Sequence, residues 1–287
     1  MIIASFTTIP ERLDAGLPAR CIRSLLAQDR RADLILVNIP AVSRKGIAYD
    51  PKKAAALEQK GVIINWIDRD YGPITKLFGT LEFIEKQGLQ DVRIILVDDD
   101  VQYDTSIFGK LIDSHEVAAG FVSRDAIIEW GRIKDTLWIP TGPQQPTAIL
   151  ETYAGVIYSA DLFLPFAVLR DWYLSLPEFC HNADDLVIAA WVQSRGTSLI
   201  KLQNETQALS HDAGETPQLN QVNLIGNNTK VLQYFFDHFY FLQWQTILTI
   251  LMAILISYGW LLGLVVCIAL VVAYAKKLNY RALTGKP

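Results

Sequence analysis

The chain has 287 residues, enough for one large or two small domains with hydrophobic cores, and its formal net charge is -4. This charge provides no basic surface of the kind that binds nucleic acid, so we expect no nucleic-acid partner. Hydrophobic residues make up 51% of the sequence, a high share for a wholly soluble protein, and the excess lies near the C-terminus.

The first hundred residues alternate between short strand-like runs and helical patterns. Apolar runs predict buried strands at 2–6, 34–39, 62–67 and 94–97. Apolar residues at helical spacing predict amphipathic helices around 17–26 and 74–84. Such alternation is typical of a parallel sheet with helices on both faces. We therefore predict an α/β fold with a largely parallel sheet flanked by helices, whose pattern loosens into shorter segments beyond residue 120.

Polar segments follow three of these predicted strands. They read "TTIPER" after the first strand, "DRDYGPITK" after the third and "DDD" after the fourth. Ligands of open α/β sheets bind outside the carboxyl ends of the strands. The three segments are therefore the candidates for a binding site.

The "DDD" segment is Asp98, Asp99 and Asp100. If the strand pleat continues to its end, Asp98 and Asp100 project to one side and Asp99 to the other. Such an Asp-x-Asp pair can hold Mg²⁺ or Mn²⁺ and leave positions open for phosphate oxygens. Three acids after a strand can also form a solvated turn or a helix cap.

Anion-binding groups are predicted at the two other segments. Gly72 and Pro73 form a turn before a helix, whose free first-turn amides could meet an anion together with Lys76. The alternative is an ordinary solvated lysine on a helix face. After the first strand, threonine hydroxyls and the Arg12 guanidinium offer similar contacts, or else form a helix N-cap and a surface arginine.

Four segments, "ASFTTIPERLD", "CIRSLLAQ…ADLILVNIP", "DYGPITKL" and "IILVDDD", resemble in order and spacing bacterial and viral nucleotide-sugar glycosyltransferases of the GT-A fold. The resemblance covers roughly residues 1–211 and implies a GT-A-like fold with a Rossmann-type mixed sheet flanked by helices. It implies a nucleoside diphosphate sugar, expected to be UDP-linked, across the first half of the sheet. It also implies Mn²⁺ or Mg²⁺ held by Asp98 and Asp100 against the diphosphate.

The same resemblance implies roles for further residues. The donor contacts it implies come from Thr7, Thr8, Arg12, Tyr71, Gly72, Lys76 and Asp98. Gly155 matches a strand beside the donor sugar, where a side chain would clash. His211 matches a metal-contacting histidine of the C-terminal part, and is otherwise a surface or satisfied residue.

An inverting transferase needs a base that takes the proton of the acceptor hydroxyl. In "HNADDLVIAAW", Asp184 and Asp185 open a predicted helix and resemble the acidic acceptor-side motif of inverting GT-A enzymes. We predict that Asp185 is the base, with Asp184 the next choice. N-capping of the helix by Asp184 is the alternative explanation.

Two other functions remain open. A nucleotidyltransferase also uses strand-end carboxylates and a diphosphate site, although it would normally have a Gly-rich triphosphate loop, and none is visible in the sequence. A membrane-tethered sugar-nucleotide-binding protein without catalytic activity is the second alternative.

The C-terminal run 247–275 contains no charged residue, which indicates membrane insertion. We predict a catalytic domain at 1–228, an aromatic interfacial segment at 229–245 and a membrane anchor with a basic tail at 246–287. A single span and a re-entrant hairpin both fit the anchor. We therefore expect membrane lipids as partners and a lipid-linked or envelope glycan as the acceptor.

The N-terminus lacks the basic region of a signal peptide, so we expect the catalytic domain on the cytosolic side of the membrane. The cysteines are Cys21, Cys180 and Cys267, an odd number at scattered positions. We therefore expect reduced thiols rather than a disulfide framework.

Overall fold

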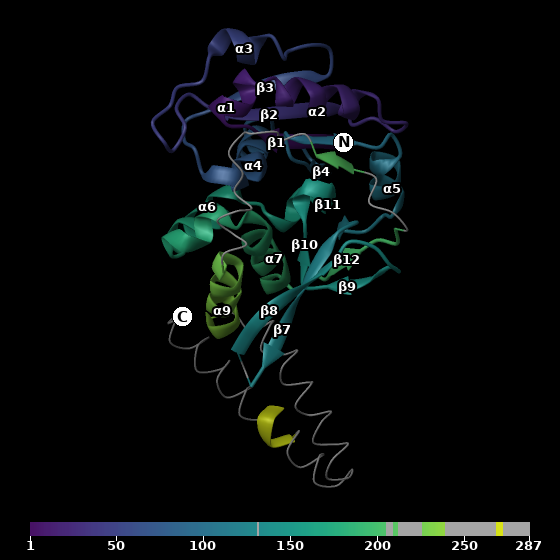
Figure 1. Ribbon diagram of the computed structural model, residues 1–287, viewed down its shortest axis with the longest axis vertical. Helices are drawn as coiled ribbons and strands as arrows, with labels where there is room; N and C mark the ends of the chain where they lie inside the picture. Colours follow the sequence, from purple (N-terminus) through teal and green to yellow (C-terminus); the bar gives the residue numbers. More distant parts are fainter. Residues whose placement is uncertain (131, 205–208, 212–225, 239–267, 272–287) are drawn as a thin grey trace. The chain divides into compact units, whose positions relative to one another are not determined.

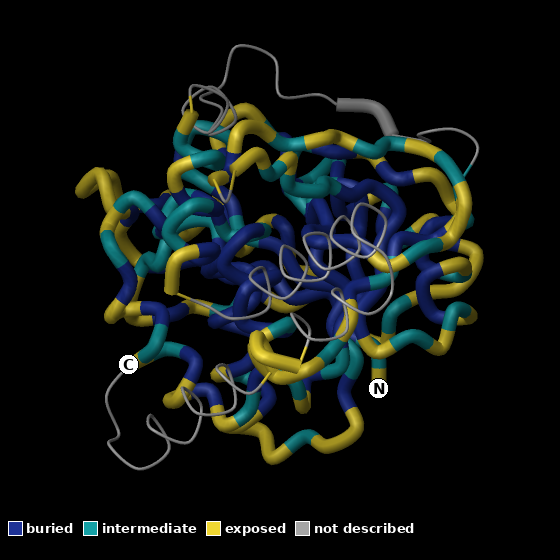
Figure 2. Tube along the Cα trace, turned by 90° about the horizontal axis from the view of Figure 1, so that it is seen from below, coloured by how far each residue is buried: buried dark blue, intermediate teal, exposed yellow. Residues whose placement is uncertain are grey.

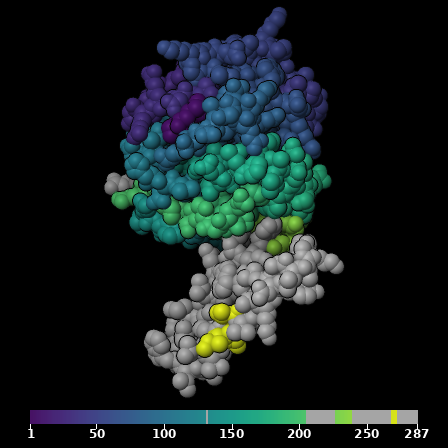
Figure 3. Space-filling model, turned by 180° about the vertical axis from the view of Figure 1, so that it is seen from behind, coloured from purple at the N-terminus to yellow at the C-terminus, as the bar shows by residue number. Residues whose placement is uncertain are grey.

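The computed structural model describes residues 1–130, 132–204, 209–211, 226–238 and 268–271. The chain divides into two compact units, Met1–Tyr234 and Phe235–Pro287, and all that follows on the site concerns the first. This boundary lies six residues beyond the predicted end of the catalytic domain at 228. In Figure 3 the first half of the sheet (purple and blue) and the later segments (teal and green) form one continuous body.

The main sheet has the strand order β3-β2-β1-β4-β11-β6-β12-β9 (Figure 1). Its strands are β1 (Ile2–Thr7), β2 (Leu34–Pro40), β3 (Val62–Ile67), β4 (Arg93–Leu96), β6 (Ala118–Gly120), β9 (Gln145–Thr147), β11 (Val156–Ser159) and β12 (Leu199–Lys201). Neighbours among β1 to β4 run parallel, whereas β11 runs antiparallel to both β4 and β6. The predicted mixed α/β sheet is confirmed.

Burial explains why the first strands are uniformly apolar. Every residue of β2 is buried, as expected for a parallel strand covered on both faces. The helix α2 (Leu17–Leu26) places Cys21, Ile22 and Leu25 in the same core cluster as β1 and β2. In Figure 2 the buried residues lie in the interior of the body and the exposed ones around its rim.

The remaining helices connect or cover the strands. They are α1 (Pro10–Asp14), α3 (Pro51–Ala55), α4 (Thr75–Gln87), α5 (Ile107–Asp113), α6 (Phe166–Ser175), α7 (Asp184–Ser194) and α9 (Asn228–His238). Short 3₁₀ helices are η1 (Gly72–Ile74), η2 (Thr152–Ala154), η3 (Ala160–Leu162) and η4 (Glu178–Asn182).

Two smaller sheets complete the unit. One joins β10 (Ile149–Leu150), β7 (Ser123–Glu129) and β8 (Arg132–Ile139), and Figure 1 shows β7 and β8 as a long hairpin. The other pairs β5 (Val101–Tyr103) with β13 (Leu209–His211). Both sheets contribute to the surroundings of the site.

The position of β1 defines where a ligand is expected. From β1 the sheet extends through β2 and β3 on one side, whereas β4 lies on the other. In open α/β sheets the crevice at such a reversal of strand order, outside the carboxyl ends, is the usual binding place. The segments after β1 and β4 flank this point.

No helix in the described part of the chain is long and apolar enough to cross a membrane. The predicted anchor lies outside the described residues except for 268–271, as does the aromatic segment beyond residue 238. The described start of that segment belongs to α9, where Val231 and Leu232 are buried and Tyr234 packs edge-on against Phe179.

Candidate active site

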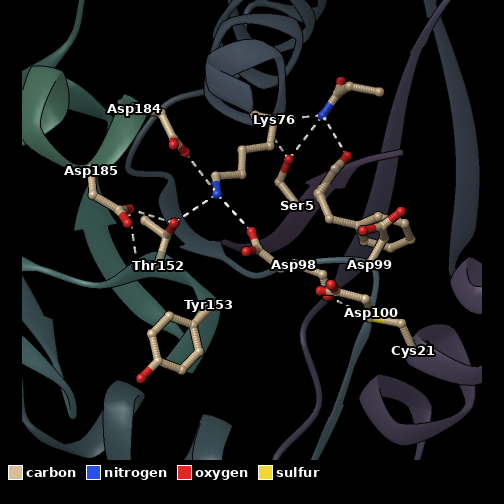
Figure 4. Close-up of polar contacts among 12 residues, drawn as sticks. Ser5, Cys21, Lys76, Asp98, Asp99, Asp100, Thr152, Tyr153, Asp184 and Asp185 are labelled. Carbon is tan, nitrogen blue, oxygen red and sulfur yellow. Dashed lines mark hydrogen bonds and ion pairs between the residues drawn. The ribbon is translucent and has the colours of Figure 1, made fainter. Parts of the chain in front are cut away.

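Five carboxylates from two segments gather at the carboxyl edge of the sheet (Figure 4). Asp98, Asp99 and Asp100 follow β4, and Asp184 and Asp185 open α7. Lys76, from the first turn of α4, lies between the two groups. Its Nζ atom is 2.7 Å from Asp98 Oδ1, 2.8 Å from Asp184 Oδ2 and 2.6 Å from Thr152 Oγ1.

Lys76 is buried, with 4% of its side chain exposed. The ammonium group donates hydrogen bonds to Asp98 and to Thr152 and forms an ion pair with Asp184. Burial alone lowers the pKa of a lysine, but the nearby charges of Asp184 and Asp98 outweigh it and hold the pKa of Lys76 well above its ordinary value. Lys76 therefore stays charged and ties the two carboxylate groups together.

Thr152, at the start of η2, joins this array to Asp185. Its backbone N–H and its hydroxyl both donate to Asp185 Oδ1, at 3.0 and 2.6 Å. Burial, followed by the charges of Asp184 and Glu151, raises the pKa of Asp185 well above its ordinary value, while Lys76 and the Thr152 hydroxyl act in the opposite direction. Such a shifted carboxyl group suits proton transfer near neutral pH.

Arg12, from α1, binds the other two acids that follow β4. Asp99 accepts from Thr8 Oγ1 and from Arg12 Nη1, each at 2.5 Å, and Arg12 Nη2 lies 3.0 Å from Asp100 Oδ2. Asp99 is 3% exposed, and this burial, together with Asp100, raises its pKa to about 6 despite the attraction of Arg12. The loop after β1 is thereby bound to the loop after β4.

The three acids do not alternate as the strand pleat predicted. β4 ends at Leu96, and Asp99 and Asp100 lie in a turn, so the two-residue repeat stops before the motif. Asp98 consequently contacts Lys76, whereas Asp100 shares Arg12 with Asp99. The expectation that Asp98 and Asp100 project together on one side is corrected accordingly.

Tyr103, a buried residue of β5, holds the turn that carries the three acids. Its hydroxyl accepts from the Asp98 N–H at 2.9 Å and donates to the Tyr153 carbonyl at 2.8 Å. This links the end of β4 directly to η2, the element that carries Thr152. Neither Tyr103 nor Thr152 stands out in the sequence, since only the tertiary fold brings them to the motif.

The backbone of His211 lies beside the same turn. In the antiparallel pair of β13 and β5, His211 is the cross-strand partner of Val101, the residue that follows Asp100. Directly opposed residues of an antiparallel pair have Cα atoms roughly 4.5–5.5 Å apart. The predicted metal-contacting role of His211 remains a prediction.

The groups expected to form an anion cradle have partners within the protein. The Tyr71 N–H donates to Thr75 Oγ1 at 2.9 Å, and the Gly72 N–H donates to Asp70 Oδ1 at 2.6 Å. Lys76 points to carboxylates and a hydroxyl instead. Gly72 has φ 76°, and a Cβ atom there would lie 2.4 Å from the Arg44 guanidinium. Donor contacts from Tyr71, Gly72 and Lys76 stay predictions.

Two other predicted donor residues have structural partners as well. Thr7 Oγ1 donates to the Asn38 carbonyl at 2.8 Å, next to Thr8. Gly155 has φ 84°, and a Cβ atom there would lie 3.3 Å from Ile107 Cγ2 and 3.5 Å from Leu111 Cδ1. Because glycine has no side chain, α5 can pack closely against this position. Space for a donor sugar at Gly155 stays a prediction.

The acids of this site fit a hard divalent cation. Five carboxylates face two basic side chains, Lys76 and Arg12, so negative charge is in excess. Among the described residues, no three His, Cys, Asp or Glu side chains form a metal-binding group. Mg²⁺ is nonetheless usually held by one or two carboxylates with phosphate oxygens and water. Asp98 and Asp100 have 33% and 13% of their side chains exposed, and their role as ligands stays a prediction.

Comparisons with known proteins give limited similarity. No family model and no curated protein matches the chain. A solved nucleoside-diphosphate-sugar pyrophosphorylase from Vibrio cholerae RC9 is 15% identical, with a TM-score of 0.47 over 78% of this chain and 100% of that one. A 4-diphosphocytidyl-2C-methyl-D-erythritol synthase is 13% identical, with a TM-score of 0.40 over 80% and 96%. These values describe a similarity of general outline.

Proposed function

We propose that the protein is a divalent-metal-dependent glycosyltransferase that moves a sugar from a nucleoside diphosphate sugar, UDP-linked, to a hydroxyl acceptor with inversion. One observation carries the proposal. A continuous array of contacts runs from Asp98 through Lys76 and Thr152 to Asp185, so a phosphate-side carboxylate and a proton-accepting carboxylate belong to one site. The resemblance of the strand-end motifs to GT-A enzymes supports the same reaction.

Each group has a distinct task in this reaction. Asp98 and Asp100 would hold Mn²⁺ or Mg²⁺, with His211 as a further ligand; the bound ion offsets negative charge that develops on the leaving diphosphate. Thr8 and Arg12 fix the loops on the nucleotide side by holding Asp99. Asp185 takes the proton of the acceptor hydroxyl as its oxygen bonds to the anomeric carbon and the bond to the diphosphate breaks.

Nucleotidyl transfer is the second candidate. The names of the two similar structures describe that chemistry better than glycosyl transfer, and strand-end carboxylates with a divalent ion serve it equally well. It requires a site for a triphosphate after β1. In this chain Arg12 of that loop is bonded to Asp99 and Asp100, and the segment "TTIPER" contains no glycine.

The products separate the two reactions. Purified protein with Mn²⁺ is incubated with a panel of nucleotide sugars and hydroxyl acceptors, and separately with nucleoside triphosphates and sugar 1-phosphates. The proposal predicts release of a nucleoside diphosphate in the first assay and no pyrophosphate in the second. Asp185→Asn should abolish the release, whereas Asp161→Asn, an exposed acid of η3, should leave it unchanged. Pyrophosphate formation would establish the second candidate, and binding without turnover the non-catalytic one.

We further propose that the acceptor is a lipid-linked or envelope glycan and that the catalytic unit faces the cytosol. The uncharged run 247–275 and the basic residues after it support this proposal. Cysteine labelling of a Lys286→Cys variant with an impermeant reagent in intact cells tests the orientation. Labelling from outside would rule out the re-entrant hairpin and leave the single span, with the catalytic unit on the other side of the membrane.

A further inference from the structure

We infer that Thr152 is the positioning residue of the proposed base: it holds Asp185 by Oδ1 and favours the ionised form, so that Oδ2 receives the acceptor proton. This inference rests on the proposed function for its catalytic consequence. The hydrogen bonds from which it is argued are present in the folded protein whichever reaction the protein catalyses.

The direction of the bonds follows from donor chemistry. Lys76 Nζ has only protons to offer, so at 2.6 Å it must donate to Thr152 Oγ1. The single proton of the Thr152 hydroxyl is then left for Asp185 Oδ1, also at 2.6 Å. The bonds thus run one way, from ammonium to hydroxyl to carboxylate.

The backbone adds a second bond to the same oxygen. The Thr152 N–H donates to Asp185 Oδ1 at 3.0 Å, so one residue holds this oxygen with two donors. Two bonds to one carboxylate oxygen fix the plane of the group and favour its charged form. The other oxygen, Oδ2, is then the proton acceptor of the reaction.

The reaction step balances with this assignment. The acceptor oxygen forms a bond to the anomeric carbon, its proton passes to Asp185 Oδ2, and the bond from that carbon to the diphosphate oxygen breaks with its electron pair on the diphosphate. Thr152 touches none of the reacting atoms. It acts through Asp185, by favouring the ionised form of the carboxylate and by keeping the group aligned before the acceptor arrives.

Charged groups from several elements face Asp185. Asp184 of α7 and Glu151 before η2 raise its pKa, while Lys76 of α4 lowers it. Arg124 of β7 and Tyr158 of β11 also interact electrostatically with Asp185, and Arg124 is paired with Glu151 at 2.7 Å. The Thr152 hydroxyl is a neutral donor, so removing it changes none of the charges around Asp185.

The test compares Thr152→Val with Thr152→Ser. Valine keeps the backbone N–H but removes the hydroxyl, so the charged form of Asp185 loses one donor and its pKa rises. We expect the acidic limb of the kcat profile to move to higher pH and kcat near neutral pH to fall about tenfold or more. Donor KM should stay within about twofold, because no donor contact is lost. Serine should restore both the limb and kcat.

A matched control exists on β9. Thr147 Oγ1 donates to Asp125 Oδ1 at 3.0 Å, and the neighbouring Ala148 N–H donates to the same oxygen at 2.8 Å. Thr147→Val therefore removes the same kind of bond from a carboxylate outside the site. It should leave kcat and its pH profile unchanged. Melting temperatures of all variants show whether a loss of activity reflects unfolding.

A second readout does not depend on activity. Carboxyl carbons of ¹³C-labelled aspartate are titrated by NMR, and the signal of Asp185 is identified by its loss in Asp185→Asn. An upward pKa shift of this signal in Thr152→Val, reversed in Thr152→Ser, supports the inference even if no nucleotide sugar is turned over, a result that would reject only the proposed function. An unshifted signal, or a shifted signal with an unchanged kcat profile in an active enzyme, would overturn it.

Discussion

Lys76 and Asp98 form an ion pair of 2.7 Å at the carboxyl edge of the sheet, in which the lysine is almost fully buried and the aspartate is one-third exposed. The pair joins the start of α4 to the end of β4, two elements that lie next to β1. The ammonium group of Lys76 is stable in this buried position because it also pairs with Asp184 and donates a hydrogen bond to Thr152. The same contacts make Lys76 essential to the fold of the site.

Replacing Lys76 by methionine should therefore destabilise the protein strongly. The change leaves Asp184 and Asp98 as neighbouring carboxylates without their cation, and removing one partner of a buried ion pair costs about 3–5 kcal/mol. Chemical denaturation at neutral pH measures the effect. Lys86→Met, an exposed lysine on the same helix, should change stability by less than about 0.5 kcal/mol. Equal stability of the two variants would show that Lys76 is not held as described.

Asp185→Asn should separate binding from chemistry. Asparagine keeps the shape of the side chain and can still accept both Thr152 bonds, but it cannot take a proton. Donor affinity should stay nearly intact while kcat falls by about two or more orders of magnitude. Calorimetric titration and steady-state kinetics measure the two quantities. If Asp184→Asn gives this result and Asp185→Asn does not, the roles of the two neighbours are exchanged.

Gly155→Ala distinguishes a packing role from a donor-sugar role. At φ 84° and ψ 119° Gly155 lies outside the left-handed helical region, so an added Cβ should cost about 1–3 kcal/mol of stability, and the contact with Ile107 should increase the loss. Gly196→Ala is the matched control, because its φ is 79° and nothing lies within 4 Å of the added Cβ. A packing role predicts a lower melting temperature for Gly155→Ala with unchanged donor KM. A raised donor KM at unchanged stability would favour the sugar-side role.

The first half of the fold was predictable because its signals are local. Fully buried parallel strands such as β2 read as unbroken apolar runs, and the acids at the end of β4 stand directly after such a run. Short strands such as β6 and β12 have three residues each, too few for a hydrophobic periodicity to be recognised. Their strand state is decided by neighbours in the sheet.

The sequence indicated which acids lie at the candidate site, but not which residues contact them. Strand ends and the helix start identified Asp98, Asp100 and Asp185, since these positions follow from local pattern. The contacts of Lys76 with Asp184 and Thr152 could not be predicted, because these residues belong to α7 and η2, in the second half of the chain. Thr152 carried no signal at all: an isolated threonine becomes informative only when its partners are known.

Cation-dependent donor binding tests the central claim most directly. Isothermal titration of the purified protein with UDP-sugars and other nucleotide sugars is performed with Mn²⁺ and with a chelator. Because Asp98 and Asp100 repel a diphosphate unless a cation lies between them, we predict binding only with Mn²⁺ or Mg²⁺, and its loss in Asp100→Asn. Equal donor affinity in Mn²⁺ and in chelator, or full affinity in Asp100→Asn, would contradict the assignment of this site.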